Sequence, residues 1–76
     1  MTNPKRINEL QAEKIARAHG CVQCGEYSYK RVKITAANPA AAEELNETWH
    51  AMLRCGVCGV ESEIGLDDEG DVLYAH

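Results

Sequence analysis

The feature that most constrains this chain is a pair of matching turns, each reading Cys-x-x-Cys-Gly. The first turn contains Cys21 and Cys24, and the second contains Cys55 and Cys58. A gap of two residues lets both sulfurs of a turn reach one ion, and the glycine accepts the positive φ that leaves backbone N–H groups free for the sulfurs. Four thiolates suit a tetrahedral metal site. We therefore predict that Cys21, Cys24, Cys55 and Cys58 bind one metal ion, with zinc as the first choice and iron as the alternative.

A chain of 76 residues with no Phe and one Trp has little material for a hydrophobic core. Domains of this size usually need disulfides or a metal as an added constraint. The first 20 residues carry charges throughout and lack the apolar run of a secretory signal, and no stretch of the chain is apolar enough to span a membrane. We therefore expect a cytoplasmic protein, in which paired cysteines favour metal over disulfide. A dithiol redox pair is disfavoured, since its βαβ context is missing.

Charge is distributed unevenly along the chain. Residues 1–33 carry a net charge of +4 and residues 34–76 carry −8, which gives −4 overall. Such asymmetry indicates charged partners. We expect a protein complex or a nucleic acid, and neither a membrane nor a small-molecule substrate.

The N-terminal segment predicts an amphipathic helix over residues 4–19. Thr2 or Asn3 can cap it, Pro4 suits its first turn, and Gly20 can end it. The residues expected on its apolar stripe are Ile7, Leu10, Ile15 and Ala18. We expect this stripe to pack over a small sheet, although docking of a partner on the helix is an alternative.

Four strands and a second helix are expected after the first turn. The strands are predicted over residues 26–35, 48–54, 60–66 and 72–75, from their alternation and their β-branched or aromatic content. Asn38 and Pro39 begin a short helix that continues to about residue 46, and residues 67–71 form a turn. A helix that continues to Leu53 is the alternative for the middle of the chain.

These elements predict one small α+β domain with an antiparallel sheet. Residues 1–20 would form a helix that packs on a metal-binding domain over residues 21–76. The chain shows no nucleophile paired with a base, no phosphate-binding loop and no paired carboxylates in a cleft, and four protein ligands leave a metal no open position for water. We therefore do not expect an enzyme.

Residues 21 to about 66 resemble a zinc ribbon. The opening Cys-Val-Gln-Cys-Gly-Glu at Cys21, the Lys-Arg-Val-Lys-Ile that begins at Lys30, and the Arg-Cys-Gly-Val-Cys-Gly that begins at Arg54 are similar to ribbons of transcription and elongation factors. The resemblance implies a non-catalytic zinc-finger adaptor in nucleic-acid metabolism, such as transcription. The insert at residues 38–46 departs from the simple hairpin of that family, and the acidic hairpin tip of the transcript-cleavage ribbons is missing.

A second resemblance is to rubredoxin, an iron electron-transfer family. Thirty residues separate Cys24 from Cys55, and Tyr27, Tyr29 and Trp49 could line an iron site. The departures are Gly56, where that family usually has proline, and an alanine-rich stretch in place of its Gly/Pro-rich loop. The zinc ribbon is the closer resemblance.

One strand face is the candidate nucleic-acid contact. Alternation over residues 26–35 predicts that Tyr27, Tyr29, Arg31 and Lys33 share a face, where tyrosines can stack on bases and cations can meet phosphates. The alternative for this strand is an ordinary solvated face. A separate hypothesis is a protein-binding ribbon, in which the acidic segment at residues 61–71 contacts a basic protein. The three histidines are expected to be structural: His19, His50 and His76.

Overall fold

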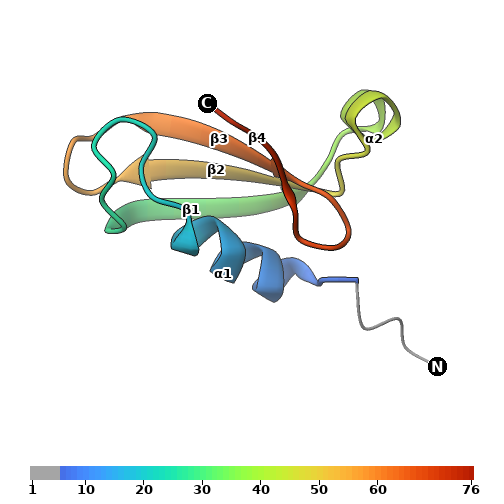
Figure 1. Cartoon of the computed structure of the whole chain (residues 1–76), viewed down its shortest axis with the longest axis horizontal. Helices are drawn as coiled ribbons and strands as arrows, with labels where there is room; N and C mark the ends of the chain where they lie inside the picture. Colours follow the sequence, from blue (N-terminus) through green and yellow to red (C-terminus); the bar gives the residue numbers. More distant parts are fainter. Residues whose placement is uncertain (1–5) are drawn as a thin grey trace.

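A computed structural model describes residues 6–76 of the chain (Figure 1). Within this range it contains helices α1 (Glu9–Ala18) and α2 (Pro39–Leu45) and strands β1 (Tyr29–Ala36), β2 (Trp49–Cys55), β3 (Glu61–Leu66) and β4 (Val72–Ala75). The strands form one antiparallel sheet in the order β1-β2-β3-β4. The α+β fold class is confirmed, and the alternative of a helix continuing to Leu53 is wrong.

Helix α1 starts later than the sequence indicates. Asn8 is its N-cap: the Gln11 backbone N–H donates to Asn8 Oδ1, and the Asn8 backbone N–H donates to Gln11 Oε1, both at 2.9 Å. This reciprocal capping box satisfies two N–H groups that the first helical turn leaves without partners, so the helix begins at Glu9. The expected caps Thr2 and Asn3, with Pro4, lie outside the described residues.

The buried stripe of α1 also differs from the expected one. Ala12 and Ala16 are fully buried against the sheet, and Ile7 and Ile15 pack beside them. Leu10 is 61% exposed and Ala18 is exposed, so neither belongs to the stripe. Alanines four residues apart let the helix lie close to the strands, because they place the smallest apolar side chains at the contact.

The core lies between α1 and one face of the sheet, which we call the inner face. On the sheet side, the buried members of the core come from β2 and β3: Ala51, Leu53, Ile64 and Leu66. Among residues 6–76, only Ile64 and Leu66 are large side chains with less than 2% exposure. The core is therefore small, as the composition indicates.

The expected helical insert connects β1 to β2, and the expected turn connects β3 to β4. Asn38 caps α2 through its side chain, which accepts from the Ala41 N–H, and Asn46 ends the helix in the left-handed region at φ 58°. In the turn, Asp67 Oδ1 accepts from two backbone N–H groups, and Gly70 has φ 92°. Both predictions from the sequence are confirmed.

Candidate metal centre

The four cysteines come from two connections at one end of the sheet. Cys21 and Cys24 lie between α1 and β1, whereas Cys55 ends β2 and Cys58 lies in the turn that leads to β3. The turns have the same backbone: the Gly25 N–H donates to Cys21 O at 2.9 Å, and the Gly59 N–H donates to Cys55 O at 3.2 Å. The two glycines have φ values of 79° and 78°, the positive range that favours glycine.

The four sulfurs converge on one point. All four Sγ atoms lie within 4.8 Å of one another, and the Cys21–Cys58 and Cys24–Cys55 pairs are 3.6 Å apart. A tetrahedron with metal–sulfur bonds of about 2.3 Å has edges of about 3.8 Å. The donor set and its spacing therefore fit one tetrahedral metal ion.

Backbone N–H groups stabilise negative charge on the sulfur at the start of each turn. Cys21 Sγ accepts from the Gln23 N–H at 3.4 Å, and Cys55 Sγ accepts from Val57 and Cys58 at 3.3 and 3.4 Å. Hydrogen bonds from the backbone of Cys24 and Gln23 lower the pKa of Cys21 to about 6. The backbone of Cys58 and Val57 lowers the pKa of Cys55 in the same way.

The second sulfur of each turn holds its proton more tightly. The backbone of Glu26 acts to lower the pKa of Cys24, but desolvation and the neighbouring thiols outweigh it and raise that pKa to about 12. The backbone of Val60 acts to lower the pKa of Cys58, but desolvation together with the thiols of Cys21 and Cys55 outweighs it and raises that pKa. A divalent metal binds thiolates, so it must displace these protons.

A metal at this point would join two separate parts of the chain. The Cys21 N–H donates to Glu26 O at 2.8 Å, and the Gly56 N–H donates to Ser28 O at 2.7 Å, so both turns are fixed to the segment that leads into β1. Cys21 and Cys55 are buried, whereas Cys24 and Cys58 are exposed. All four positions of a tetrahedral ion would be occupied by protein, as in structural rather than catalytic zinc sites.

The predicted nucleic-acid residues do not share one face. The pairing of β1 with β2 shifts between Tyr29 and Arg31, as a β-bulge does. Tyr29 therefore packs on the core side beside Val32, and its hydroxyl donates to His19 O. The expectation that Tyr29 joins Arg31 and Lys33 is wrong, because the extra residue of a bulge reverses the alternation on one side of it. Burial raises the pKa of Tyr29, with the nearby thiolates as a further cause.

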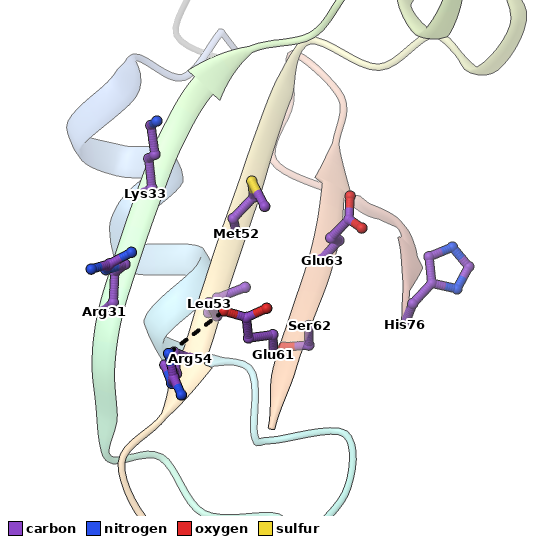
Figure 2. A pocket seen from close by; sticks show the side chains of 9 residues that line it. All are labelled: Arg31, Lys33, Met52, Leu53, Arg54, Glu61, Ser62, Glu63 and His76. Atoms are coloured by element: carbon purple, nitrogen blue, oxygen red, sulfur yellow. Dashed lines mark ion pairs between the residues drawn. The ribbon is translucent and has the colours of Figure 1, made fainter. Parts of the chain in front are cut away.

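The other three members of that set remain accessible. Tyr27 precedes β1 and is 65% exposed. Arg31 and Lys33 lie on the face of the sheet opposite α1, which we call the outer face (Figure 2). Their contact with nucleic acid stays a prediction.

Figure 2 shows the side chains that line a shallow hollow on this outer face, with cations on β1 and carboxylates on β3. Met52 lies between them on β2 and is 49% exposed. Arg54 and Glu61 form an ion pair at 3.8 Å. The outer face is defined by six residues: Arg31, Lys33, Met52, Arg54, Glu61 and Glu63.

Sequence reasoning missed a polar cluster at the far end of the outer face. His50 Nδ1 lies 3.0 Å from Glu47 Oε2, and His50 Nε2 lies 2.8 Å from Glu63 Oε1. The Tyr74 hydroxyl donates to Glu47 Oε2 at 3.0 Å, and Glu47 is only 3% exposed. Burial, together with a hydrogen bond to Glu47, raises the pKa of Tyr74 to about 12. No signal in the sequence joins these residues, because β4 and the loop before β2 meet only through the sheet.

Gly65 makes room for this cluster. A Cβ at Gly65 would clash with the Tyr74 ring and would lie 2.9 Å from Glu47 Oε2. The other two histidines lie elsewhere: the His19 ring contacts Gly20 O at 3.0 Å, and the His76 ring lies 4.9 Å from that of Tyr74. None of the three approaches the cysteine cluster as a ligand within the described residues.

Comparison with protein-family models, with curated proteins and with solved structures gives no match for this chain. Among residues 6–76, no helix is both long and apolar enough to cross a membrane. The function must therefore be inferred from the residues and their geometry.

Proposed function

We propose that this chain is a non-catalytic binding module, in which a zinc ion fixes a ribbon-like fold and the outer face of the sheet binds another protein. The observation that carries the proposal is the convergence of four cysteine sulfurs within 4.8 Å. Such a site contributes folding energy and leaves no position for a substrate. The resemblance of Cys21–Cys24 and Cys55–Cys58 to a zinc ribbon supports zinc over iron.

Protein is the favoured partner because the outer face carries both signs of charge around an apolar centre. Glu61 and Glu63 stand on β3 across Met52 from the cations of β1. Phosphates would be repelled by these carboxylates, and Tyr29 is turned away as a stacking surface. Mixed charge around a methionine is instead suited to a protein surface, where apolar contact gives affinity and charge gives specificity.

Nucleic acid is the second candidate. Arg31 and Lys33 are exposed and form no ion pair with any other residue in the range 6–76, and Tyr27, which precedes β1, is 65% exposed. Two cations and one aromatic ring could hold a short single strand. An adaptor role in transcription rests on this candidate and on the family resemblance.

A photo-crosslinking amino acid at position 52 tests the proposed function. Placed at Met52 and irradiated in extracts of the producing cell, it should join the chain to a protein, either another polypeptide or a second copy. The same group at Leu10, which is 61% exposed on α1, is the matched control and should give no such product. Adducts with nucleic acid, or equal yields from both positions, would contradict a protein-binding outer face.

A further inference from the structure

Among the residues that the structure describes, 6–76, no helix packs over the middle of the outer face. Helix α1 packs on the inner face, where it contacts β1 and β2 (Figure 1). Met52, at the centre of the outer face, is 49% exposed. A large apolar side chain in the middle of a charged sheet face is the arrangement found at the centre of protein contacts.

The strand register arranges the outer face in two rows across the sheet. In the first row, Lys33 on β1 stands opposite Met52 on β2, and Met52 stands opposite Glu63 on β3. In the second row, Arg31 stands opposite Arg54, which stands opposite Glu61. From β1 to β3, each row therefore runs from a cation to a carboxylate, and in the first row His76 follows Glu63 (Figure 2).

Such rows are complementary to themselves under one kind of symmetry. A two-fold axis parallel to the strands, placed over β2, brings β1 of one copy above β3 of the other and leaves β2 above β2. Each cation then faces a carboxylate, and Met52 faces Met52. A two-fold axis that lies above the sheet and runs across the strands would instead place β1 over β1, so that cations would face cations.

We infer that the outer face pairs with the outer face of a second copy of this chain, about a two-fold axis parallel to the strands and over Met52. The inference rests on the proposed function, because it names the protein that this face binds. Lys33 would meet Glu63 of the second copy, and Arg31 would meet its Glu61. Sheets packed face to face with nearly aligned strands are a common arrangement, and a two-fold contact is isologous.

The central position of the second row is compatible with this pairing. Arg54 would face Arg54 of the second copy, but each guanidinium has Glu61 of its own chain 3.8 Å away. Two carboxylates thus lie beside the two guanidinium groups. A second copy fits better than a nucleic acid, which offers no cations to Glu61 and Glu63.

Two charge-reversed variants of the metal-loaded chain, measured separately and then mixed, test the inference. Arg31→Glu and Glu61→Lys should each weaken the dimer by at least about ten-fold in sedimentation equilibrium, because each puts two like-charged contacts into the interface. An equimolar mixture of the two variants should associate more tightly than either variant alone, since each reversed charge then meets its opposite. It should stay weaker than the wild type, because Glu61→Lys removes one of the two carboxylates beside the facing Arg54 groups. Met52→Glu, which places two carboxylates on the axis, should abolish the dimer.

For Glu61→Lys, repulsion between net charges and local pairing across the interface predict opposite changes in association. The formal charge of the chain is −4, and Glu61→Lys brings it to −2. If long-range repulsion alone controlled association, this variant would associate more tightly than the wild type; local pairing predicts that it associates more weakly. Lys14→Glu on α1 and Glu69→Lys in the turn are controls with the same changes of charge at exposed positions. They should leave the dimer within about two-fold of the wild type.

A wild-type chain that stays monomeric up to millimolar concentration would overturn the inference. So would a dimer that is indifferent to Arg31→Glu and Glu61→Lys, or a mixture that associates no more tightly than either variant alone. If the position-52 crosslinker nevertheless joins a different protein, the proposed function stands and only the identity of the partner is wrong. If it joins no protein at all, both fail.

Discussion

Removal of the metal should unfold this domain. The change considered is Cys55→Ser, which replaces a ligand that is 2% exposed and whose Sγ accepts two backbone N–H groups. A serine hydroxyl stays protonated and cannot supply the thiolate that the site needs. The same loss should follow from a strong chelator on the unaltered chain.

The size of the effect follows from the small core. Leu53, Ile64 and Leu66 are its three large aliphatic side chains, each at most 2% exposed. At about 1.5–3 kcal/mol each, their burial contributes roughly 5–9 kcal/mol. Structural zinc contributes about 10–16 kcal/mol in finger peptides. The net stability of a small domain is only about 5–15 kcal/mol, so the loss of a contribution of this size should leave the chain without a stable fold.

Circular dichroism and thermal melting, with and without chelator, measure this effect. The matched control is Val57→Ser, at a residue of the same turn that is 60% exposed and is not a ligand. This control should melt cooperatively within a few degrees of the wild type, whereas Cys55→Ser should show no cooperative transition. An unchanged melting curve after metal removal would show that the metal is not needed for the fold, since the core alone would then be sufficient.

Three other predictions concern the sheet faces. Gly65→Ala should destabilise the chain by about 1–3 kcal/mol in urea unfolding, because its Cβ would displace the Tyr74 ring from Glu47; a variant as stable as the wild type would contradict this contact. The raised pKa of Tyr74 stabilises the fold below pH 10, and this stabilisation should be lost as pH rises from about 10 to about 12; Tyr74→Phe should flatten the loss, and an identical alkaline profile would contradict it. If nucleic acid binds, Arg31→Glu combined with Lys33→Glu should weaken single-stranded RNA binding at low salt at least ten-fold, whereas binding indifferent to both changes would exclude this surface.

The group of four cysteines is the part of the molecule that the sequence predicts best. Its information is local, because each Cys-x-x-Cys-Gly turn fixes its own geometry through a glycine with positive φ. The short helix α2 is similarly local, since Asn38 and Pro39 supply its cap and first turn. Only the meeting of the two turns depends on the sheet, and it agrees with the prediction that both turns bind one ion.

The faces of β1 and α1 are predicted poorly because they depend on tertiary contacts. The bulge near Tyr29 reverses one side of the alternation, and it is visible only in the pairing with β2. On α1, burial of Ala12 and Ala16 instead of Leu10 follows from how closely the helix approaches the sheet. Periodicity shows that a helix has an apolar side, but close packing decides which residues face the core.

The most direct test of this account is the metal content of the purified chain together with its visible spectrum. Production in zinc-supplied and in iron-supplied medium separates the preference of the site from the supply of metal. We expect a colourless protein with one zinc ion per chain in both media, bound by Cys21, Cys24, Cys55 and Cys58. A red, iron-loaded protein from both media would contradict zinc and favour the rubredoxin resemblance. A folded chain that binds no metal at all would contradict the central claim.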